Sequence, residues 1–152
     1  MQLDDFVLYL DENLQNCKPI LDALAASQVR FERHEAHFQR GEEDEVWLPQ
    51  VADWGWIVLT KDKRNRYNDV ERAAVRRHRV REFYFSAGNM NGAEMAQALV
   101  AALPKMREII NQYESPIVGS ITRAGAVTVL YDREGSTHER RKAKAAKAAD
   151  DV

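Results

Sequence analysis

Short apolar runs of strand length alternate with helical patterns along most of this chain. That alternation is typical of a parallel sheet covered by helices on both faces. The runs that predict strands are Phe6–Leu10, Val29–Arg33, Trp56–Thr60 and Glu82–Ser86. We therefore expect an α/β fold, a three-layer α/β/α sandwich with a mainly parallel central sheet.

The segments between these runs carry helix signals. Residues 15–26 place Ile20, Leu21, Leu24 and Ala25 on one helical face. Two later helix starts have capping-box spacing, Asn68 with Glu71 and Asn91 with Glu94. Pro104 interrupts the pattern that follows the second box, so we expect a kink or two consecutive helices there.

The chain is long enough for one domain with a single core, at 152 residues. We place the core of the domain at about residues 6–113, followed by a C-terminal β-hairpin over residues 117–131 that turns at Thr122–Gly125. Residues 1–133 form the domain on this interpretation. Residues 134–152 form a charged tail rich in Lys and Ala, which we expect to be a frayed helix or disordered.

Composition excludes several classes of function. Cys17 is the one cysteine, which excludes an intrachain disulfide and a cysteine-based zinc site. No apolar run approaches the roughly 20 residues of a membrane span, and the N-terminus lacks a signal pattern. The glycine motifs of dinucleotide-binding and P-loop proteins are missing. We expect a soluble, cytoplasmic protein with no membrane partner.

Charge is unevenly distributed, although the net charge is only -2. Residues 32–53 are mostly acidic, and residues 61–81 are mostly basic. An acidic region followed by a basic one suits a polyanionic substrate held near a cation site. The alternative is that both regions are solvated faces of helices.

The stretch "FVLYLDENL" ends an apolar strand in two carboxylates and an amide. Residues just past the C-terminal ends of parallel strands line the functional crevice of a doubly wound sheet. Asp11 and Asn13 follow the first strand, Asp62 follows the strand that ends at Thr60, and "GEEDE" (residues 41–45) begins the helix between them. Three segments thus direct carboxylates to one edge of the sheet.

Such an arrangement needs a counter-ion. Two carboxylates about 4 Å apart repel by roughly 4 kcal/mol at an effective dielectric constant near 20. Either a proton or a divalent cation relieves that repulsion. Oxygen ligands without thiolates suit Mg²⁺ or Mn²⁺, and a hard cation flanked by basic residues is suited to phosphodiester hydrolysis.

The motifs "LYLDEN", "GEEDE" and "IVLTKDK", in that order, resemble the PIN domain superfamily. They look most like the PIN-like group that includes the VapC-like ribonuclease toxins of toxin–antitoxin systems. The resemblance covers roughly residues 6–113. It implies a metal-dependent endoribonuclease with Mg²⁺ or Mn²⁺ as cofactor, RNA as substrate and a cognate antitoxin protein as partner. A homodimer is a further possible assembly.

The resemblance also implies roles for individual residues. Asp11 matches the first acid of the family, and Asp44 matches the second, although Glu43 and Glu45 compete for that role. Asp62 matches the third acid, and Asp69 is the candidate for a fourth. Asn13 and Thr60 match supporting polar positions. We expect the RNA phosphates to be held by the neighbouring bases Lys61, Lys63, Arg64 and Arg66. Pro49 departs from the pattern because it lies inside the helix that should carry the second acid.

Each acid also has a structural interpretation. Asp11 would serve as a helix N-cap, Asp62 as a turn residue, and Asp44 as a favourable charge at a helix N-terminus. A PIN-like binding module that has lost catalysis is therefore the alternative function, and a phosphoacceptor receiver domain is a weaker one. We expect His34 and His37 to be surface loop residues. The three tryptophans fit a core or an interface better than a base-stacking platform.

Overall fold

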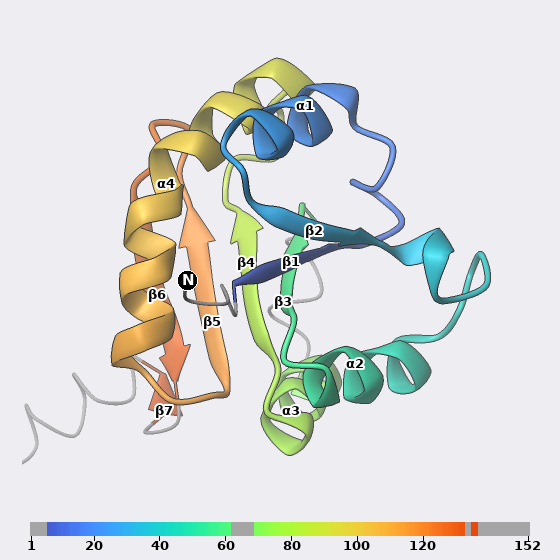
Figure 1. Cartoon of the computed structure of the whole chain (residues 1–152). Helices are drawn as coiled ribbons and strands as arrows, with labels where there is room; N and C mark the ends of the chain where they lie inside the picture. Colours follow the sequence, from blue (N-terminus) through green and yellow to red (C-terminus); the bar gives the residue numbers. More distant parts are fainter. Residues whose placement is uncertain (1–5, 62–68, 133–134, 137–152) are drawn as a thin grey trace, which may run out of the picture.

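The computed structural model describes residues 6–61, 69–132 and 135–136. Within these residues the chain forms one seven-stranded sheet, and the strands lie in the order β2-β1-β3-β4-β5-β6-β7 (Figure 1). The strands are β1 (Val7–Leu10), β2 (Arg30–Arg33), β3 (Ile57–Thr60), β4 (Arg81–Phe85), β5 (Ile117–Ile121), β6 (Val127–Asp132) and β7 (Gly135–Ser136). Strands β1 to β5 are parallel, and β6 and β7 are antiparallel to their neighbours. The expected mainly parallel sheet is confirmed.

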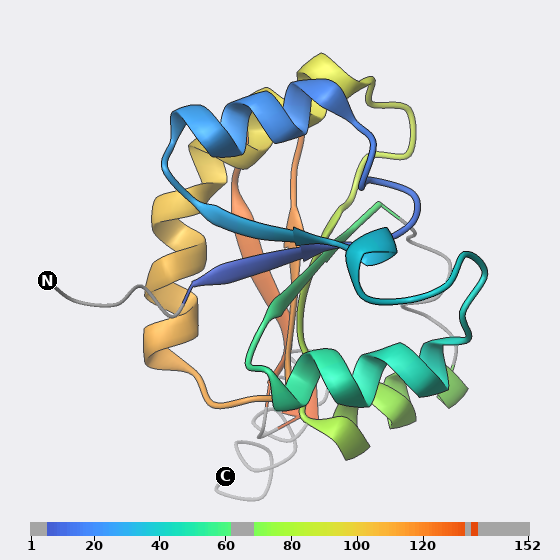
Figure 2. The same cartoon turned by 45° about the vertical axis from the view of Figure 1, so that its right-hand side comes forward.

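The helices lie on both faces of the sheet (Figures 1 and 2). Helices α1 (Lys18–Ala26) and α4 (Gly92–Gln112) pack together on one face. Helices α2 (Asp44–Asp53) and α3 (Asp69–His78) pack together on the other. A short 3-10 helix, η1 (His34–Ala36), follows β2. The expected three-layer α/β/α sandwich is therefore also confirmed.

The strands divide their side chains between two cores, because successive residues of a strand point to opposite faces. Leu8 and Leu10 of β1 join the larger core beneath α1 and α4. Tyr9, between them, joins the smaller core beneath α2 and α3, together with Trp47 and Val58. The burial of strands on both faces explains why their sequences read as continuous apolar runs.

Two helices differ in detail from the sequence pattern. Helix α1 begins at Lys18 and not at residue 15, because the residues before it form hydrogen-bonded turns that start at the Asp11 carbonyl. Helix α4 begins with the predicted capping box of Asn91 and Glu94. It is one helix that contains Pro104, and Figure 1 shows it bending along its length. Asn68, the start of the other predicted box, lies outside the described residues.

The predicted C-terminal hairpin is present as β5 and β6. Its turn contains Gly125 at a φ of 86°, and a Cβ built there would lie 2.5 Å from the Cβ of Ala101 in α4. Only glycine satisfies both the backbone angle and this close approach. Strand β7 then extends the sheet into the segment that was expected to be a tail, while residues 137–152 lie outside the described residues.

No helix in the described part of the chain is both long and apolar enough to span a membrane.

Candidate active site

The C-terminal ends of β1 and β3 lie side by side, because the two strands pair in parallel with Leu10 opposite Leu59. Asp11 and Thr60 are the next residues along, one from each strand. The hydroxyl of Thr60 donates a hydrogen bond of 2.5 Å to Oδ2 of Asp11. Thr60 is buried, so this bond fixes the Asp11 carboxylate at the edge of the sheet.

The second oxygen of Asp11 accepts two backbone hydrogen bonds, from the N–H groups of Asn13 at 3.0 Å and of Leu14 at 3.2 Å. The carboxylate therefore caps the turn that follows β1. It is not the helix N-cap of the structural interpretation, because the N-cap of α1 is Cys17. Capping this turn is compatible with binding a metal ion, because each carboxylate oxygen has two lone pairs. Asn13 donates its backbone N–H to this carboxylate and is itself exposed.

Asp44 is the first residue of α2, although Pro49 lies inside that helix. Proline there removes one hydrogen bond, to the carbonyl four residues earlier, without moving the helix start. The indole N–H of Trp47 donates a 3.0 Å hydrogen bond to Oδ1 of Asp44 and so orients its carboxylate. The competing acids Glu43 and Glu45 are exposed, whereas Asp44 is half-buried.

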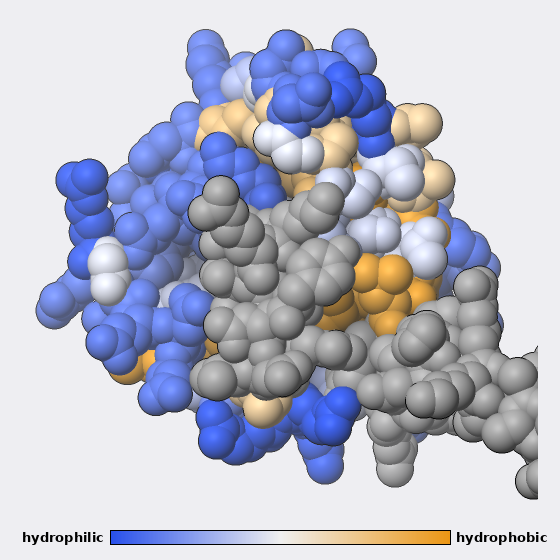
Figure 3. Space-filling model, turned by 180° about the vertical axis from the view of Figure 1, so that it is seen from behind, coloured by the Kyte–Doolittle hydropathy of each residue, from blue (hydrophilic) through white to orange (hydrophobic). Residues whose placement is uncertain are grey.

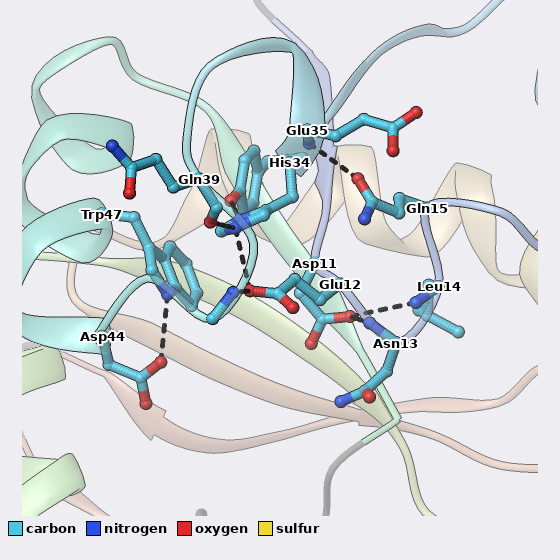
Figure 4. A network of polar contacts seen from close by, with 12 residues as sticks. Asp11, Glu12, Asn13, Leu14, Gln15, His34, Glu35, Gln39, Asp44 and Trp47 are labelled. Atoms are coloured by element: carbon cyan, nitrogen blue, oxygen red, sulfur yellow. Dashed lines mark hydrogen bonds and ion pairs between the residues drawn. The ribbon is translucent and has the colours of Figure 1, made fainter.

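Tyr9, His34 and Glu12 form a polar network. Figure 4 shows His34 and Glu12 of this network near Asp11. The phenol of Tyr9 bonds Nδ1 of His34, and Nε2 of His34 lies 3.0 Å from the carbonyl of Gln39 and 3.1 Å from Oε1 of Glu12. Because both neighbours of Nε2 are acceptors, this nitrogen carries the hydrogen and Nδ1 accepts from Tyr9. Glu12 also accepts a 2.6 Å hydrogen bond from the backbone of Gly41.

The network corrects one expectation. His34 was expected to be a surface loop residue, but only 1% of its surface is exposed, because its ring lies among Tyr9, Phe38 and Trp47. His37 is partly exposed and pairs with Glu32 at 3.0 Å. Among the tryptophans, Trp47 is buried as expected, while Trp54 is 43% exposed.

The negative charges of three carboxylates act on the phenol of Tyr9. Burial raises the pKa of its phenol well above the usual value of about 10, and the negative charges of Asp11, Glu12 and Asp44 raise it further. All three acids therefore lie close enough to act on one hydroxyl. We call these three residues the acidic edge.

The donor chemistry of the acidic edge fits a hard divalent cation. Asp11 and Asp44 offer carboxylate oxygens, which are the ligands that Mg²⁺ and Mn²⁺ prefer. Across the described residues, no group of three or more His, Cys, Asp or Glu side chains is close enough to hold a metal ion. Mg²⁺ keeps several water ligands, so two carboxylates are enough to hold it in a site of this kind.

The remaining predicted site residues follow β3, and the structure describes only some of them. Lys61 is exposed directly after β3. Asp69 begins α3, but its side chain is not among those described. The rest of this group lies outside the described residues: Asp62, Lys63, Arg64 and Arg66.

Sequence reasoning missed the support that the network gives to this edge. Glu12 had no assigned role, and neither Tyr9 nor His34 was a candidate. The signal that could have found Tyr9 is a hydroxyl two residues before Asp11 in an otherwise apolar strand, since a buried phenol needs a partner. Nothing in the local sequence indicates that His34 supplies it, because the two residues meet only when β1 and β2 pair.

The fold and the acidic edge together define a doubly wound α/β protein with carboxylates directly after β1 and at the start of α2. A family model described as a PIN like domain matches residues 7–87, and the chain belongs to this family. The match confirms the resemblance to the PIN superfamily, whose members are generally nucleases. No curated protein and no solved structure matches the chain significantly.

Proposed function

We propose that this protein is a Mg²⁺- or Mn²⁺-dependent endoribonuclease and the toxin of a toxin–antitoxin pair. The observation that supports this best is the hydrogen bond between Thr60 and Asp11, because it holds the first family acid at the edge where β1 and β3 end. Asp44 at the start of α2 supplies a second oriented carboxylate, and its charge acts on the same phenol of Tyr9 as that of Asp11. Membership of the PIN-like family makes nuclease chemistry the expected use of such an edge.

Asp11 and Asp44 would hold the cation, with Asp62 as the proposed third ligand. When bound, a divalent ion activates a water molecule and stabilises the charge that develops on the phosphate. Thr60 and Trp47 keep the two described carboxylates oriented. The carboxylates therefore do not have to reorient during the reaction. Glu12 is held by His34 and Gly41, so we assign it to supporting the loop after η1.

The basic residues after β3 would hold the RNA. Lys61 is exposed at the end of β3, one residue beyond the threonine that binds Asp11. Its ammonium group is therefore available to a phosphate near the acidic edge, and Lys63, Arg64 and Arg66 extend the same basic segment in sequence. The ammonium group of Lys61 at this position would favour binding of a polyanion, while the carboxylates bind the metal ion.

The direct test is cleavage of a panel of labelled structured RNAs by the purified protein with Mn²⁺, Mg²⁺ or EDTA. We expect cleavage only with metal, and its loss in Asp11→Asn and in Asp62→Asn. Asp22→Asn is the matched control, since Asp22 is an exposed acid on α1, and it should cut like the wild type. Equal cutting by the wild type and both site variants would identify a contaminating nuclease and reject the proposal.

The toxin role has a separate test. Expression of the wild-type protein in a bacterial host should arrest growth, whereas Asp11→Asn at the same protein level should not. A wild type that cuts RNA in vitro but leaves growth unaffected would reject the toxin role and keep the nuclease. If the protein neither cuts RNA nor binds Mn²⁺, the alternative of a PIN-like binding module without catalysis replaces both.

A further inference from the structure

A second charged site lies at the opposite edge of the sheet from the acidic edge. The pocket there has a volume of about 600 Å³ and is lined by Arg76, Arg79, Arg81, Tyr113, Glu114, Ser115 and Pro116. We call it the arginine pocket. Arg81 begins β4, and the acidic edge lies beyond the other end of the parallel strands, so the length of a five-residue strand, roughly 13 Å, separates the two edges.

Three chain segments build the arginine pocket. Arg76 lies in the last turn of α3 and Arg79 directly follows that helix. Arg81 is the first residue of β4, and the remaining lining residues come from the connection between α4 and β5. The backbone N–H of Ile117 donates a 3.0 Å hydrogen bond to the carbonyl of Val80, which joins two of these segments. Hydrophilic side chains lie at the bottom of the coloured part of the surface in Figure 3, at the height of α3 in Figure 1.

The chemistry of the pocket wall favours an oxyanion. The described lining residues include three arginines and one acidic residue, Glu114. Tyr113 and Ser115 add hydroxyl groups that can donate hydrogen bonds. Arg81 is half-buried, and its Nη2 donates a hydrogen bond to the carbonyl of Gly55, which holds the guanidinium in place. Planar guanidinium groups bind phosphate through paired N–H donors, and several of them together form a typical phosphate site.

Helix electrostatics alone do not explain these arginines. Cations near the C-terminus of a helix interact favourably with its dipole, and this accounts for Arg76 in the last turn of α3. It does not account for Arg81, which belongs to a strand. Arg79 directly follows α3, so the dipole favours its charge as well, but its φ of 57° lies in the left-handed region that favours glycine. The chain therefore has an arginine at a position where the backbone conformation favours glycine.

We propose that the arginine pocket binds a phosphate group. The phosphate could belong to a nucleic-acid strand or to a small phosphorylated molecule, and both sources share this chemistry. This inference does not depend on the proposed nuclease activity, since it concerns binding at an edge of the sheet remote from the carboxylates. Ligands of doubly wound folds usually bind at the C-terminal edge, so a phosphate site at the N-terminal edge would be a second site.

Arg79 offers a test in which loss of binding is separated from loss of folding. Arg79→Gly removes the guanidinium and also relieves the left-handed backbone, so the variant should be at least as stable as the wild type. Gln28→Gly is the matched control: Gln28 lies two residues after α1, has a φ of 58° and is exposed. The residue after each of the two positions donates its N–H to the carbonyl five residues earlier, Val29 to Leu24 and Val80 to Val75. It does not line the pocket.

The measurement is calorimetric titration of the full chain, in EDTA, with inorganic pyrophosphate and with an unstructured RNA of about ten nucleotides. EDTA removes divalent ions, so the acidic edge cannot capture phosphate through a metal. We expect at least one probe to bind, with affinity that falls at least fivefold in Arg79→Gly, is partly restored in Arg79→Lys, and is unchanged in Gln28→Gly. Affinity should also fall as salt rises.

The two probes distinguish the source of the phosphate. Binding of RNA alone assigns the pocket to a nucleic-acid strand, and binding of pyrophosphate alone assigns it to a small ligand; both outcomes support the inference. Binding of neither probe at millimolar concentration overturns it. Equal affinity in the wild type and Arg79→Gly, or equal loss in Gln28→Gly, overturns it as well. Because cleavage is not measured, these results stand apart from the success or failure of the proposed function.

Discussion

Thr60 donates its hydroxyl hydrogen to the carboxylate of Asp11 and thereby ties the end of β3 to the end of β1. The two residues are 49 positions apart in sequence and meet only because the two strands are adjacent and parallel. One oxygen of Asp11 is oriented by this bond and the other by backbone N–H groups. The carboxylate is therefore positioned before any ligand arrives, which is what a metal site at this edge requires.

Replacing Thr60 by valine should impair the site more than the fold. Valine keeps the volume but removes the donor to Asp11, and the loss of such a supporting group typically lowers metal affinity or activity by about 10–100-fold. The cost in unfolding free energy should be about 1 kcal/mol. Thr60→Ser should restore activity, and Thr128→Val, at an exposed position of β6, should change neither quantity. Full activity in Thr60→Val would contradict the positioning role.

The competition among three neighbouring acids can be resolved by substitution. Asp44→Asn should reduce RNA cleavage by about 100-fold, since it removes a charged ligand from the site. Glu43→Gln and Glu45→Gln should retain activity, because both side chains are exposed and only Asp44 is oriented by Trp47. Asp53→Asn, at the other end of α2, controls for the lost charge. A larger effect at residue 43 or 45 would transfer the second-acid role there.

The buried histidine should matter for stability. His34→Phe keeps an aromatic ring but leaves the phenol of Tyr9 and the carbonyl of Gln39 without their hydrogen-bond partner. We expect a loss of about 2–3 kcal/mol in unfolding free energy, measured by urea denaturation. His37→Phe is the control, and it should cost less than about 1 kcal/mol, because the pair with Glu32 is partly exposed. Similar losses in both variants would argue against the network.

The raised pKa of Tyr9 should make the stability of the protein fall at alkaline pH. Its pKa is raised in the folded state by burial and by the acidic edge, so the folded protein keeps a proton that the unfolded chain loses above about pH 10. Stability from this group is complete below that pH and falls as pH rises, by up to about 1.4 kcal/mol per pH unit. Tyr9→Phe should show a shallower fall above pH 10. Parallel curves for the two proteins would show that Tyr9 does not contribute.

Much of the fold could be predicted because strand length, helix caps and turn residues are local signals. The apolar runs located four of the parallel strands to within about a residue at each end, and Thr122–Gly125 located the hairpin turn. The position of Asp11 and Thr60 at one edge followed from the rule for parallel sheets. These inferences need no knowledge of how side chains pack.

What could not be predicted depends on contacts between distant segments. The burial of His34 results from the pairing of β1 with β2, which brings the histidine onto Tyr9. The arginine pocket likewise combines the end of α3 with the connection before β5. A run of arginines in sequence is as typical of a solvated helix face as of a binding site. The connection between α4 and β5, which lies far away in sequence, is what makes these arginines part of a pocket.

The most direct test of the acidic edge is Mn²⁺ binding, because it does not require the natural RNA. Calorimetric titration of the wild type should show binding, and Asp11→Asn should weaken it at least tenfold, while Asp53→Asn leaves it unchanged. That result would establish Asp11 as part of a metal site at the C-terminal edge of the sheet. Equal Mn²⁺ affinity in the wild type and Asp11→Asn, or no binding by the wild type, would contradict the account.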